Sequence, residues 1–457
     1  MEGKKKRKQV DMLHGSLLDK ILLFALPLAA SSILQQLFNS VDVAVVGRFA
    51  SSQAQAAVGC NGPVVNLMIN LFVGISVGTN VVIANYIGQK KTDRIHDAVH
   101  TSILLALICG VIMMVLGMFI ARPILELMDT PADVLEYAVL YLRIYFVGMP
   151  FIMVYNFGAA VLRSIGDTRR PLYCLVLSGI INAILNLVLV IGFKMGVEGV
   201  AIPTVLSNVV SAGMVWYFLT HETGAIRLEP KKLSIKKQEL VLMLQIGVPA
   251  GLQNMVFSVA NVFIQASLNG FGSDAVAGSA VGINCEYYTY YMITAFNQAA
   301  VTFISQNFGA GFKDRCKKVF RLTMASSMII TALMSLAFIF GRVPFVALFT
   351  GQQAVAEFAY VRILHIMPLY ILINTYEIGG SALRGVGCSM TPAILTVFGT
   401  CVLRLIWIYT VCPRYHTLDM LFNVYPISWF VTGAAVLIAY VLVWRRIDKG
   451  IKGRTAL

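Results

Sequence analysis

The dominant pattern along the chain is a series of long apolar stretches separated by short polar ones. A helix of about 20 apolar residues crosses the hydrocarbon core of a bilayer. Stretches of that length or more lie at 18–46, 54–86, 95–121, 134–161, 171–192, 197–220, 240–267, 276–308, 318–340, 354–383, 391–411 and 423–446. The pattern therefore predicts an all-α polytopic membrane protein with twelve transmembrane helices, interrupted by a charged linker at 221–239.

Composition and charge support this prediction. Of the 457 residues, 58% are hydrophobic and only 13% are charged, against about 25% charged in soluble domains. The net charge of +14 could suggest a nucleic-acid binder, but most Lys and Arg residues lie in alternate short loops and at the termini. Positive charge concentrates on the cytoplasmic side of membrane proteins. We therefore expect no nucleic-acid partner, and a multi-pass protein of the cytoplasmic (inner) cell membrane with both termini in the cytoplasm.

The two halves of the chain carry the same short motifs at a nearly constant separation. Gly88 and Gly309 are 221 residues apart, as are Arg163 and Arg384 in the sequences LRSIG and LRGVG. Each half has an even number of spans, so the repeat is parallel, with an axis along the membrane normal. This predicts two pseudo-symmetric six-helix lobes, with the arginines as orientation charges in loops and the glycines as helix stops.

The predicted organisation follows from these boundaries. Its parts are a basic cytoplasmic tail (1–16), an N-terminal lobe (17–220), a cytoplasmic linker (221–239), a C-terminal lobe (240–446) and a cytoplasmic C-terminal tail (447–457). The eight cysteines are scattered, mostly within apolar stretches and with no CxxC pair, so we interpret them as small core residues.

An acidic residue lies inside the first apolar stretch. Asp42 shares a helical face with Gln35 and Asn39, because the three are spaced at i, i+4 and i+7. A carboxylate at the centre of a bilayer costs roughly 3 kcal/mol on insertion scales, so it should face protein or water. The pattern predicts that Asp42 is the charge-carrying group of a transporter, with Gln35 and Asn39 beside it in a substrate cavity. The alternative is an Asp that packs helices together through a neighbouring hydroxyl.

With this repeat, the chain resembles the MATE (multidrug and toxic compound extrusion) transporters, in particular their prokaryotic DinF-type branch. The resemblance covers nearly the whole chain. It rests on Ser40-Val41-Asp42, on NYIGQKKTDR with its partner QNFGAGFKDR, and on LRSIGDTRRP with its partner LRGVGCSMTP. It implies an efflux antiporter for multiple drugs or organic cations, driven by H+ or Na+, whose two lobes open alternately to each side. It implies no cofactor besides the coupling ion.

The resemblance also implies an ion site in the N-terminal lobe. The positions that match the site of DinF-type members are Asp42, Asn156, Asn182, Asn186 and Thr204. Those members carry a second Asp where this chain has Asn186, so one carboxylate remains here. Amides and hydroxyls can hold it in either protonation state, because they both donate and accept hydrogen bonds. Each Asn can equally be interhelical glue, which contributes about 0.6–2 kcal/mol.

The C-terminal half offers polar residues of several kinds. Asn254, Asn261 and Gln265 form a polar stripe without charge on the 240–267 helix, in which NorM-type members carry a Glu at the place of Phe257. We expect this stripe to face the substrate cavity. The ion chemistry is therefore expected in the N-terminal lobe.

Three charges and two tyrosines of the same half remain. Because intramembrane charges tend to pair, Glu377 is predicted to pair with Arg404. The alternative is that Glu377 or Glu286 attracts a cationic substrate. Tyr287 and Tyr291 share a face, and either offer their rings to an organic cation or form an interfacial belt.

Other functions fit less well. A flippase for lipid-linked sugars is the main alternative, but its cavity should be cationic, whereas the polar face around Asp42 is acidic or neutral. The spans carry no His or Cys metal cluster, no Walker-type loop and no Ser-His-Asp set, so we expect neither an enzyme nor an ATP-driven pump. The expected partners are small amphipathic or cationic substrates and the lipid bilayer, and we expect a monomer.

Overall fold

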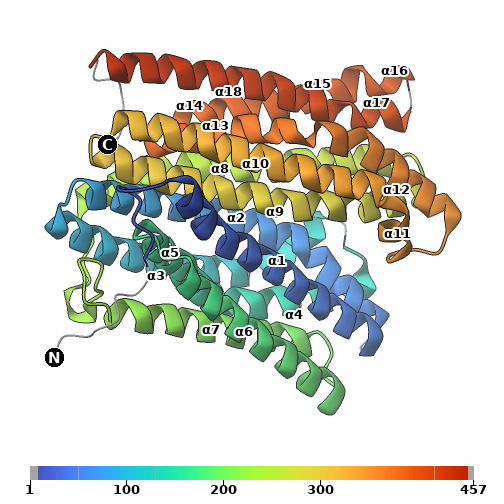
Figure 1. Ribbon diagram of the computed structural model, residues 1–457. Coiled ribbons are helices and arrows are strands. Elements are labelled where there is room, and N and C mark those ends of the chain that lie inside the picture. Colours follow the sequence, from blue (N-terminus) through green and yellow to red (C-terminus); the bar gives the residue numbers. More distant parts are fainter. Residues whose placement is uncertain (1–8, 50, 129, 416, 451–457) are drawn as a thin grey trace. The chain divides into compact units, whose positions relative to one another are not determined.

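The computed structural model describes residues 9–49, 51–128, 130–415 and 417–450, and these are almost entirely helical (Figure 1). The basic residues at 4–8 and the last residues of the C-terminal tail, 451–457, lie outside the described residues. The helices of the first half are α1 (Leu18–Phe49), α2 (Ser52–Gly88), α3 (Thr92–Leu127), α4 (Ala132–Val147), α5 (Met149–Ser164), α6 (Arg169–Leu187), the π-helix η1 (Val188–Gly192), α7 (Glu198–Thr220) and the short η2 (Pro230–Lys232).

The second half follows the same succession of long helices. Its elements are α8 (Lys237–Asn269), α9 (Ser273–Gly309), α10 (Lys313–Phe340), α11 (Arg342–Ala347), α12 (Gln353–Ile366), η3 (Met367–Leu372), α13 (Ile373–Gly385), α14 (Met390–Thr396), the π-helix η4 (Val397–Val402), α15 (Leu403–Thr410), α16 (Cys412–Tyr415), α17 (Leu418–Phe422) and α18 (Val424–Asp448). The predicted all-α polytopic fold is confirmed.

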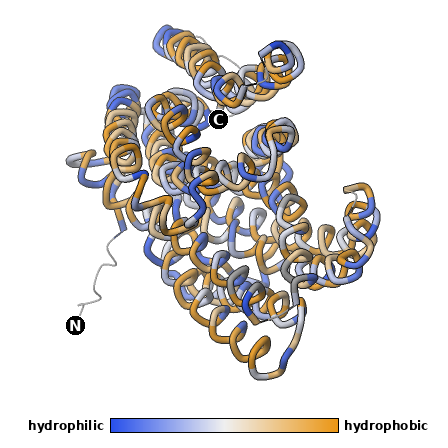
Figure 2. The backbone as a smooth tube through the Cα atoms, turned by 90° about the vertical axis from the view of Figure 1, so that its right-hand side faces the viewer, coloured by the Kyte–Doolittle hydropathy of each residue, from blue (hydrophilic) through white to orange (hydrophobic). Residues whose placement is uncertain are grey.

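Apolar residues predominate along most helices (Figure 2), as expected where both neighbouring helices and lipid surround a span. In the described part of the chain, ten helical segments are long and apolar enough to cross a membrane, and the pair α4 and α5 raises the number to eleven. That pair is bent by 47°. The bend lies at Gly148 and Pro150, where the proline ring cannot continue a regular helix.

Two other predicted spans change their type of helix along their length. The 354–383 stretch forms α12 and α13 with the 3-10 segment η3 between them, and Pro368 lies at the start of η3. The 391–411 stretch forms α14 and α15 joined by the π-helix η4, without a break in the chain direction. An apolar pattern does not reveal such changes of helix type, because hydropathy is insensitive to the hydrogen-bond register of the backbone.

The chain forms two compact units. One holds Leu26–Leu244 with the chain up to Asp11, and the other holds Met12–Ala25 with the chain from Gln245 onward. The changes from one unit to the other therefore fall inside α1 and α8, just before Pro27 and Pro249. Each unit includes the beginning of a long helix whose remainder belongs to the other unit.

Equivalent positions of the repeat hold these two helix beginnings. In the first unit, Tyr86 Oη and Arg94 Nη1 both donate to the carboxylate of Glu239, near the start of α8, at 2.6 Å. In the second unit, Asn307 Nδ2 donates to the backbone oxygen of Met12 at 3.1 Å, and Arg315 donates to the oxygens of Met12, His14 and Gly15 at 3.1–3.3 Å. Asn307 and Arg315 follow Tyr86 and Arg94 by 221 residues.

The glycines of the repeated LRxxG motif end helices, as predicted. Gly166 and Gly387 have φ of 85° and 84°, a left-handed conformation that favours glycine. The backbone nitrogens of the next residues, Asp167 and Cys388, return to the oxygens of Leu162 and Leu383 at 3.1 and 2.9 Å. Such hydrogen bonds satisfy carbonyls that would otherwise be free at a helix end.

Candidate functional site

Asp42 meets the predicted amides of α6. The Asn186 side-chain nitrogen donates to Asp42 Oδ1 and, at 3.2 Å, to Asn182 Oδ1. Asn182 and Asn186 are one turn apart and buried, whereas Asp42 is half-buried. The hydrogen bonds join α1 to α6, and they bring together three of the residues predicted from the sequence.

Thr204 of α7 completes this cluster through Asn182. In one orientation of the Asn182 amide, its nitrogen lies 3.4 Å from Thr204 Oγ1. In the opposite orientation, which satisfies more partners, the nitrogen donates to Asp42 Oδ1 at 2.8 Å and the oxygen accepts from the Thr204 backbone nitrogen at 3.3 Å. An amide can rotate between these states, so Asn182 is able to follow a change in the charge of Asp42.

A glycine brings the two helices close enough for this cluster to form. A Cβ atom at Gly179 of α6 would lie 1.8 Å from Cε2 of Phe38 on α1. Phe38 is one turn before Asp42, and Gly179 is two turns before Asn186. Small residues at helix interfaces allow close backbone approach in membranes, and here the approach lets the short side chains of Asp42 and Asn186 meet.

One acceptor atom of the cluster, Asn186 Oδ1, receives no hydrogen bond from the described residues. The atom is buried, and a buried amide oxygen without a partner is costly. If the Asn186 amide turned, this oxygen would take the place of its nitrogen beside Asp42 and Asn182, where it could help to hold a hard cation or accept a proton carried by Asp42.

The other residues predicted for the N-terminal site have different surroundings from those of the Asp42 cluster. Asn156 donates its side-chain nitrogen to Ile152 O, in its own helix, at 2.9 Å, so this hydrogen bond does not join it to Asp42. Gln35 and Asn39 are exposed on α1. The phenols of Tyr141 and Tyr145 on α4, which the sequence did not suggest, are within electrostatic reach of Asp42.

Glu377 has its own set of partners in the second unit. Tyr290 Oη donates to Glu377 Oε1 at 3.1 Å, and the Asn297 side-chain nitrogen donates to Oε2. Asn297 in turn accepts from Ser381 Oγ. The sequence did not predict Tyr290 and Asn297, although they lie one and three turns after Glu286 on the same helix.

The structure corrects the predicted pair of Glu377 and Arg404, because it gives Arg404 uncharged partners. Arg404 Nε donates to Ser428 Oγ at 3.1 Å, and Nη1 donates to Asn261 Oδ1 at 3.3 Å. Its guanidinium carbon lies 5.1 and 4.8 Å from the ring centres of Phe257 and Tyr425. Aromatic faces and neutral oxygens therefore surround this charge in place of a carboxylate.

Glu286 pairs with an arginine of the second unit. Arg362 Nε donates to Glu286 Oε1 at 2.6 Å, and Arg362 Nη1 donates to Ser279 Oγ at 2.8 Å. Both side chains of the ion pair are largely buried, with 3% and 13% of their surface exposed. The sequence signal for this pair was Arg362 itself, a charge inside a predicted span.

Three of the other predicted cavity residues, Tyr287, Tyr291 and Gln265, contact neighbours in their own helices. Tyr287 and Tyr291 share a face, as predicted, and their rings stack with centres 6.4 Å apart. Gln265 donates to Asn269 Oδ1 at 3.1 Å on the exposed side of α8. Asn254 is half-buried and Asn261 is exposed.

Arg384 is not the loop charge that the sequence suggested. It is buried, and its Nη2 donates to Gln253 Oε1 of α8 at 2.6 Å. The repeat therefore places an arginine inside the second unit, where it acts electrostatically on Glu377. A motif at the end of a span looks like a loop in the sequence, because only the packing of neighbouring helices decides how deep it lies.

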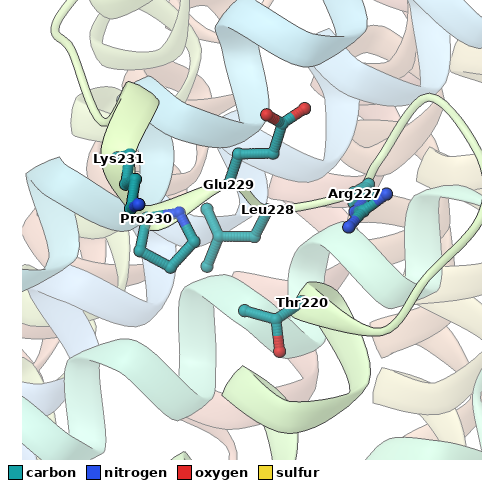
Figure 3. A pocket seen from close by; sticks show the side chains of 6 residues that line it. All are labelled: Thr220, Arg227, Leu228, Glu229, Pro230 and Lys231. Carbon is teal, nitrogen blue, oxygen red and sulfur yellow. The ribbon is translucent and has the colours of Figure 1, made fainter.

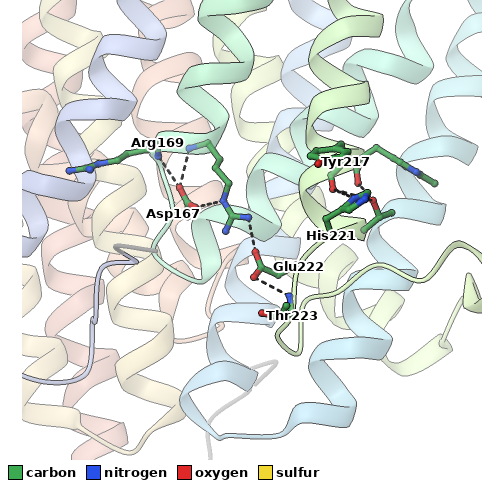
Figure 4. A network of polar contacts seen from close by, with 9 residues as sticks. Asp167, Arg169, Tyr217, His221, Glu222 and Thr223 are labelled. Carbon is green, nitrogen blue, oxygen red and sulfur yellow. Dashed lines mark hydrogen bonds and ion pairs between the residues drawn. The ribbon is translucent and has the colours of Figure 1, made fainter. Parts of the chain in front are cut away.

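A further ion network lies in the first unit. Arg170 pairs with Asp167 and, at 2.6 Å, with Glu222 beyond the end of α7, and all three side chains are about one-tenth exposed (Figure 4). Cys388 stands at the position equivalent to Asp167. The network anchors the start of the 221–239 linker.

The same linker borders a hollow of about 370 Å³, formed by Thr220 and by Arg227 to Lys231 (Figure 3). Lys232, whose amine lies 2.8 Å from Glu229, holds the pKa of that carboxyl below its usual range. These residues lie at the end of α7 and beyond it, away from the cluster at Asp42, so we do not assign the hollow to the transport site.

Comparisons with known proteins agree with the internal repeat and with the membrane-spanning fold. The family model MatE matches the chain twice, at residues 27–188 and 249–410, in accordance with the internal repeat. The chain is 28% identical to the probable multidrug resistance protein YoeA of Bacillus subtilis, over 93% of each chain, and 27% identical to the probable multidrug resistance protein NorM of Thermotoga maritima, over 84% of each. A solved MOP superfamily transporter from Pyrococcus furiosus has a TM-score of 0.91 at 21% identity, covering 97% of this chain and 100% of that one.

Proposed function

Because this chain belongs to the MATE family of multidrug efflux transporters, we propose that it is a cation-coupled antiporter in which Asp42 carries the coupling charge. Export proceeds by alternating access: the two units open in turn to each side of the membrane. The observation that supports this proposal best is the hydrogen bond from Asn186 to Asp42, which places a membrane carboxylate among neutral amides and not beside a cation.

The coupling ion that we propose is H+, with Na+ as the alternative. When Asp42 is charged, Asn186 and Asn182 can donate to it. When it is protonated, its hydroxyl can donate to an amide oxygen, and Asn186 Oδ1 is a buried acceptor without another partner. The cluster can therefore satisfy both charge states by turning amide groups, which suits a site that alternates between them.

The substrates that we propose are small amphipathic molecules, among them organic cations. The protein would reside in the cytoplasmic membrane with both termini in the cytoplasm, because the Lys and Arg residues concentrate in loops on that side. We propose a monomer as the working unit, since each half supplies its own polar cluster.

Proteoliposomes test the proposal. The purified protein should export a fluorescent cation such as ethidium against its gradient when a pH gradient is imposed, and Asp42→Asn should stop this uphill transport. Asn keeps the size and the hydrogen bonds of the residue but cannot exchange a proton. The matched control is Asp19→Asn, which removes an exposed carboxylate at the start of the same helix and should leave transport unchanged.

Replacing the pH gradient with a Na+ gradient identifies the ion. If Asp42→Asn exports the cation uphill as well as the parent under either gradient, the proposal is wrong.

A further inference from the structure

The interior of the second unit holds a cation that no carboxylate balances. Arg362 is paired with Glu286, and Arg384 is near Glu377, but within the described residues no Asp or Glu forms an ion pair with Arg404. Arg404 is nevertheless completely buried, with 0% of its surface exposed. A charged side chain at that depth is expensive unless it is paired or functional.

The hydrogen-bonding capacity of Arg404 is also incomplete. Nε and Nη1 donate to Ser428 and Asn261, and the rings of Phe257 and Tyr425 lie against the guanidinium. Nη2 is buried, and the described residues offer it no acceptor. A guanidinium presents two parallel N–H groups that match the two oxygens of a carboxylate or phosphate, and one of the donors here is vacant.

Asn261 connects this buried charge with the exposed face of α8. Asn261 is exposed, and its Oδ1 lies 3.3 Å from Arg404 Nη1. A rotation of the Asn261 side chain would free Nη1 beside the vacant Nη2. An oxyanion in the place of Asn261 Oδ1 could then accept from Nη1 and from the neighbouring Nη2, and the rings of Phe257 and Tyr425 would remain as apolar walls.

The backbone around Arg404 fits a binding role. Arg404 is the second residue after the π-helix η4 (Val397–Val402). Wide turns of this kind add one residue to a helix, re-aim the side chains that follow, and are frequent at functional sites.

We propose that Arg404, gated by Asn261, binds the anionic group of an amphipathic substrate, a carboxylate or a phosphate, with Phe257 and Tyr425 against its apolar part. This deepens the proposed export function, since it adds anionic and zwitterionic amphiphiles to the substrate class. The oxyanion takes the place of Asn261 Oδ1 on Nη1 and also accepts from Nη2. The net positive charge inside this unit then has a counter-ion only while substrate is bound.

The test is a binding measurement on the full chain in nanodiscs of phosphatidylcholine. The probes share one naphthalene ring and differ in their charge: 1-naphthoate, 1-naphthyl phosphate, 1-naphthylmethylammonium and the neutral 1-naphthylmethanol. At least one of the two anions should bind the parent about tenfold more tightly than the alcohol does, which is the size expected of one charge-assisted hydrogen bond. The affinity of the ammonium compound should not fall when Arg404 is replaced.

Two variants and one control separate binding from folding. Arg404→Gln removes the charge without leaving a carboxylate unpaired, and it should abolish the preference for anions. Asn261→Asp keeps Arg404 and supplies a permanent carboxylate beside it, so it should abolish the preference while raising the melting temperature. Asn269→Asp, two turns further along α8, adds the same charge away from Arg404 and should preserve the preference.

The outcomes decide between binding and a purely structural role for Arg404. If the parent binds neither anion better than the alcohol, or if Asn261→Asp retains the preference, the proposal is overturned even where Arg404→Gln does not fold. Adding phosphatidylglycerol to the nanodiscs identifies the source of the ligand: competition with naphthoate indicates a lipid headgroup, and unchanged affinity indicates a soluble substrate. Because no ion gradient is involved, the result stands whether or not Asp42 proves to couple transport.

Discussion

Arg94 Nη1 donates to Glu239 Oε1 at 2.6 Å, and the two side chains of this pair differ in their access to solvent. The Glu239 side chain is completely buried, whereas 40% of that of Arg94 is exposed. Tyr86 Oη is the second donor to Glu239, at 2.6 Å. The pair holds the beginning of α8 on the first unit, at a position whose repeat equivalent, Arg315, holds the segment before α1.

The difference in exposure predicts unequal effects of mutation at this pair. Arg94→Gln leaves a buried carboxylate with Tyr86 as its remaining strong donor, so it should lower the melting temperature more than Glu239→Gln does. The loss should be smaller than that of a fully buried pair, because water screens the exposed partner. Glu239→Gln should cost less than about 1 kcal/mol, since Arg94 can turn to water. Melting temperatures of the purified variants check this order, and a larger loss for Glu239→Gln would contradict it.

The Glu286–Arg362 pair should behave as a buried unit. Either Glu286→Gln or Arg362→Gln leaves one charge without its partner in the interior, so each should lower stability by about 3–5 kcal/mol. The double variant should recover most of this loss, because no charge remains unpaired. Thermal unfolding of all four proteins forms a double-mutant cycle. A double variant that loses as much stability as the two single variants together would show that the pair contributes no coupling energy.

The close approach of α1 and α6 should be necessary for the cluster at Asp42. Gly179→Ala places a Cβ 1.8 Å from the ring of Phe38, so the ring must move or the helices must separate. Overpacking of this kind costs about 1–3 kcal/mol, and the separation should also break the Asn186–Asp42 hydrogen bond. We expect uphill export to fall more than melting temperature, and Phe38→Ala in the same chain to restore it. Gly213→Ala on α7 has no atom within 4 Å to meet and serves as the control.

A second carboxylate beside Asp42 should change the ion dependence. In Asn186→Asp, two carboxylates share one site, and their repulsion favours a bound cation between them. Oxygen ligands of this kind suit hard cations. Export under a Na+ gradient should therefore rise several-fold relative to the parent, measured by ethidium efflux from proteoliposomes. Asn182→Asp, one turn earlier, tests whether the position matters. Equal Na+ dependence in the parent and both variants would contradict the prediction.

The sequence predicts the parts of this protein that depend on hydrophobicity and on local backbone chemistry. Apolar length determines which segments span a bilayer, and the recurrence of LRxxG at one separation reveals the two halves. Gly166 and Gly387 end helices because their φ values are positive, a requirement of the turn itself. The partners of Asp42 are a different case: Asn182, Asn186 and Thr204 lie on other helices and were implied by the resemblance to the MATE transporters, whereas Gln35 and Asn39, which share the helical face of Asp42, are exposed.

Only the tertiary structure decides which buried charges are partners. Two helices of an apolar pattern can pack in many rotations that bury similar area, so the sequence does not determine which of Arg362, Arg384 and Arg404 approaches which glutamate. The pair predicted from depth alone, Glu377 with Arg404, is replaced by Glu286 with Arg362. Arg404 is left among a serine, an asparagine and two rings. Hydrophobicity sets the depth of each charge in the membrane, but the directional hydrogen bonds that neutralise it depend on the rotation and spacing of packed helices.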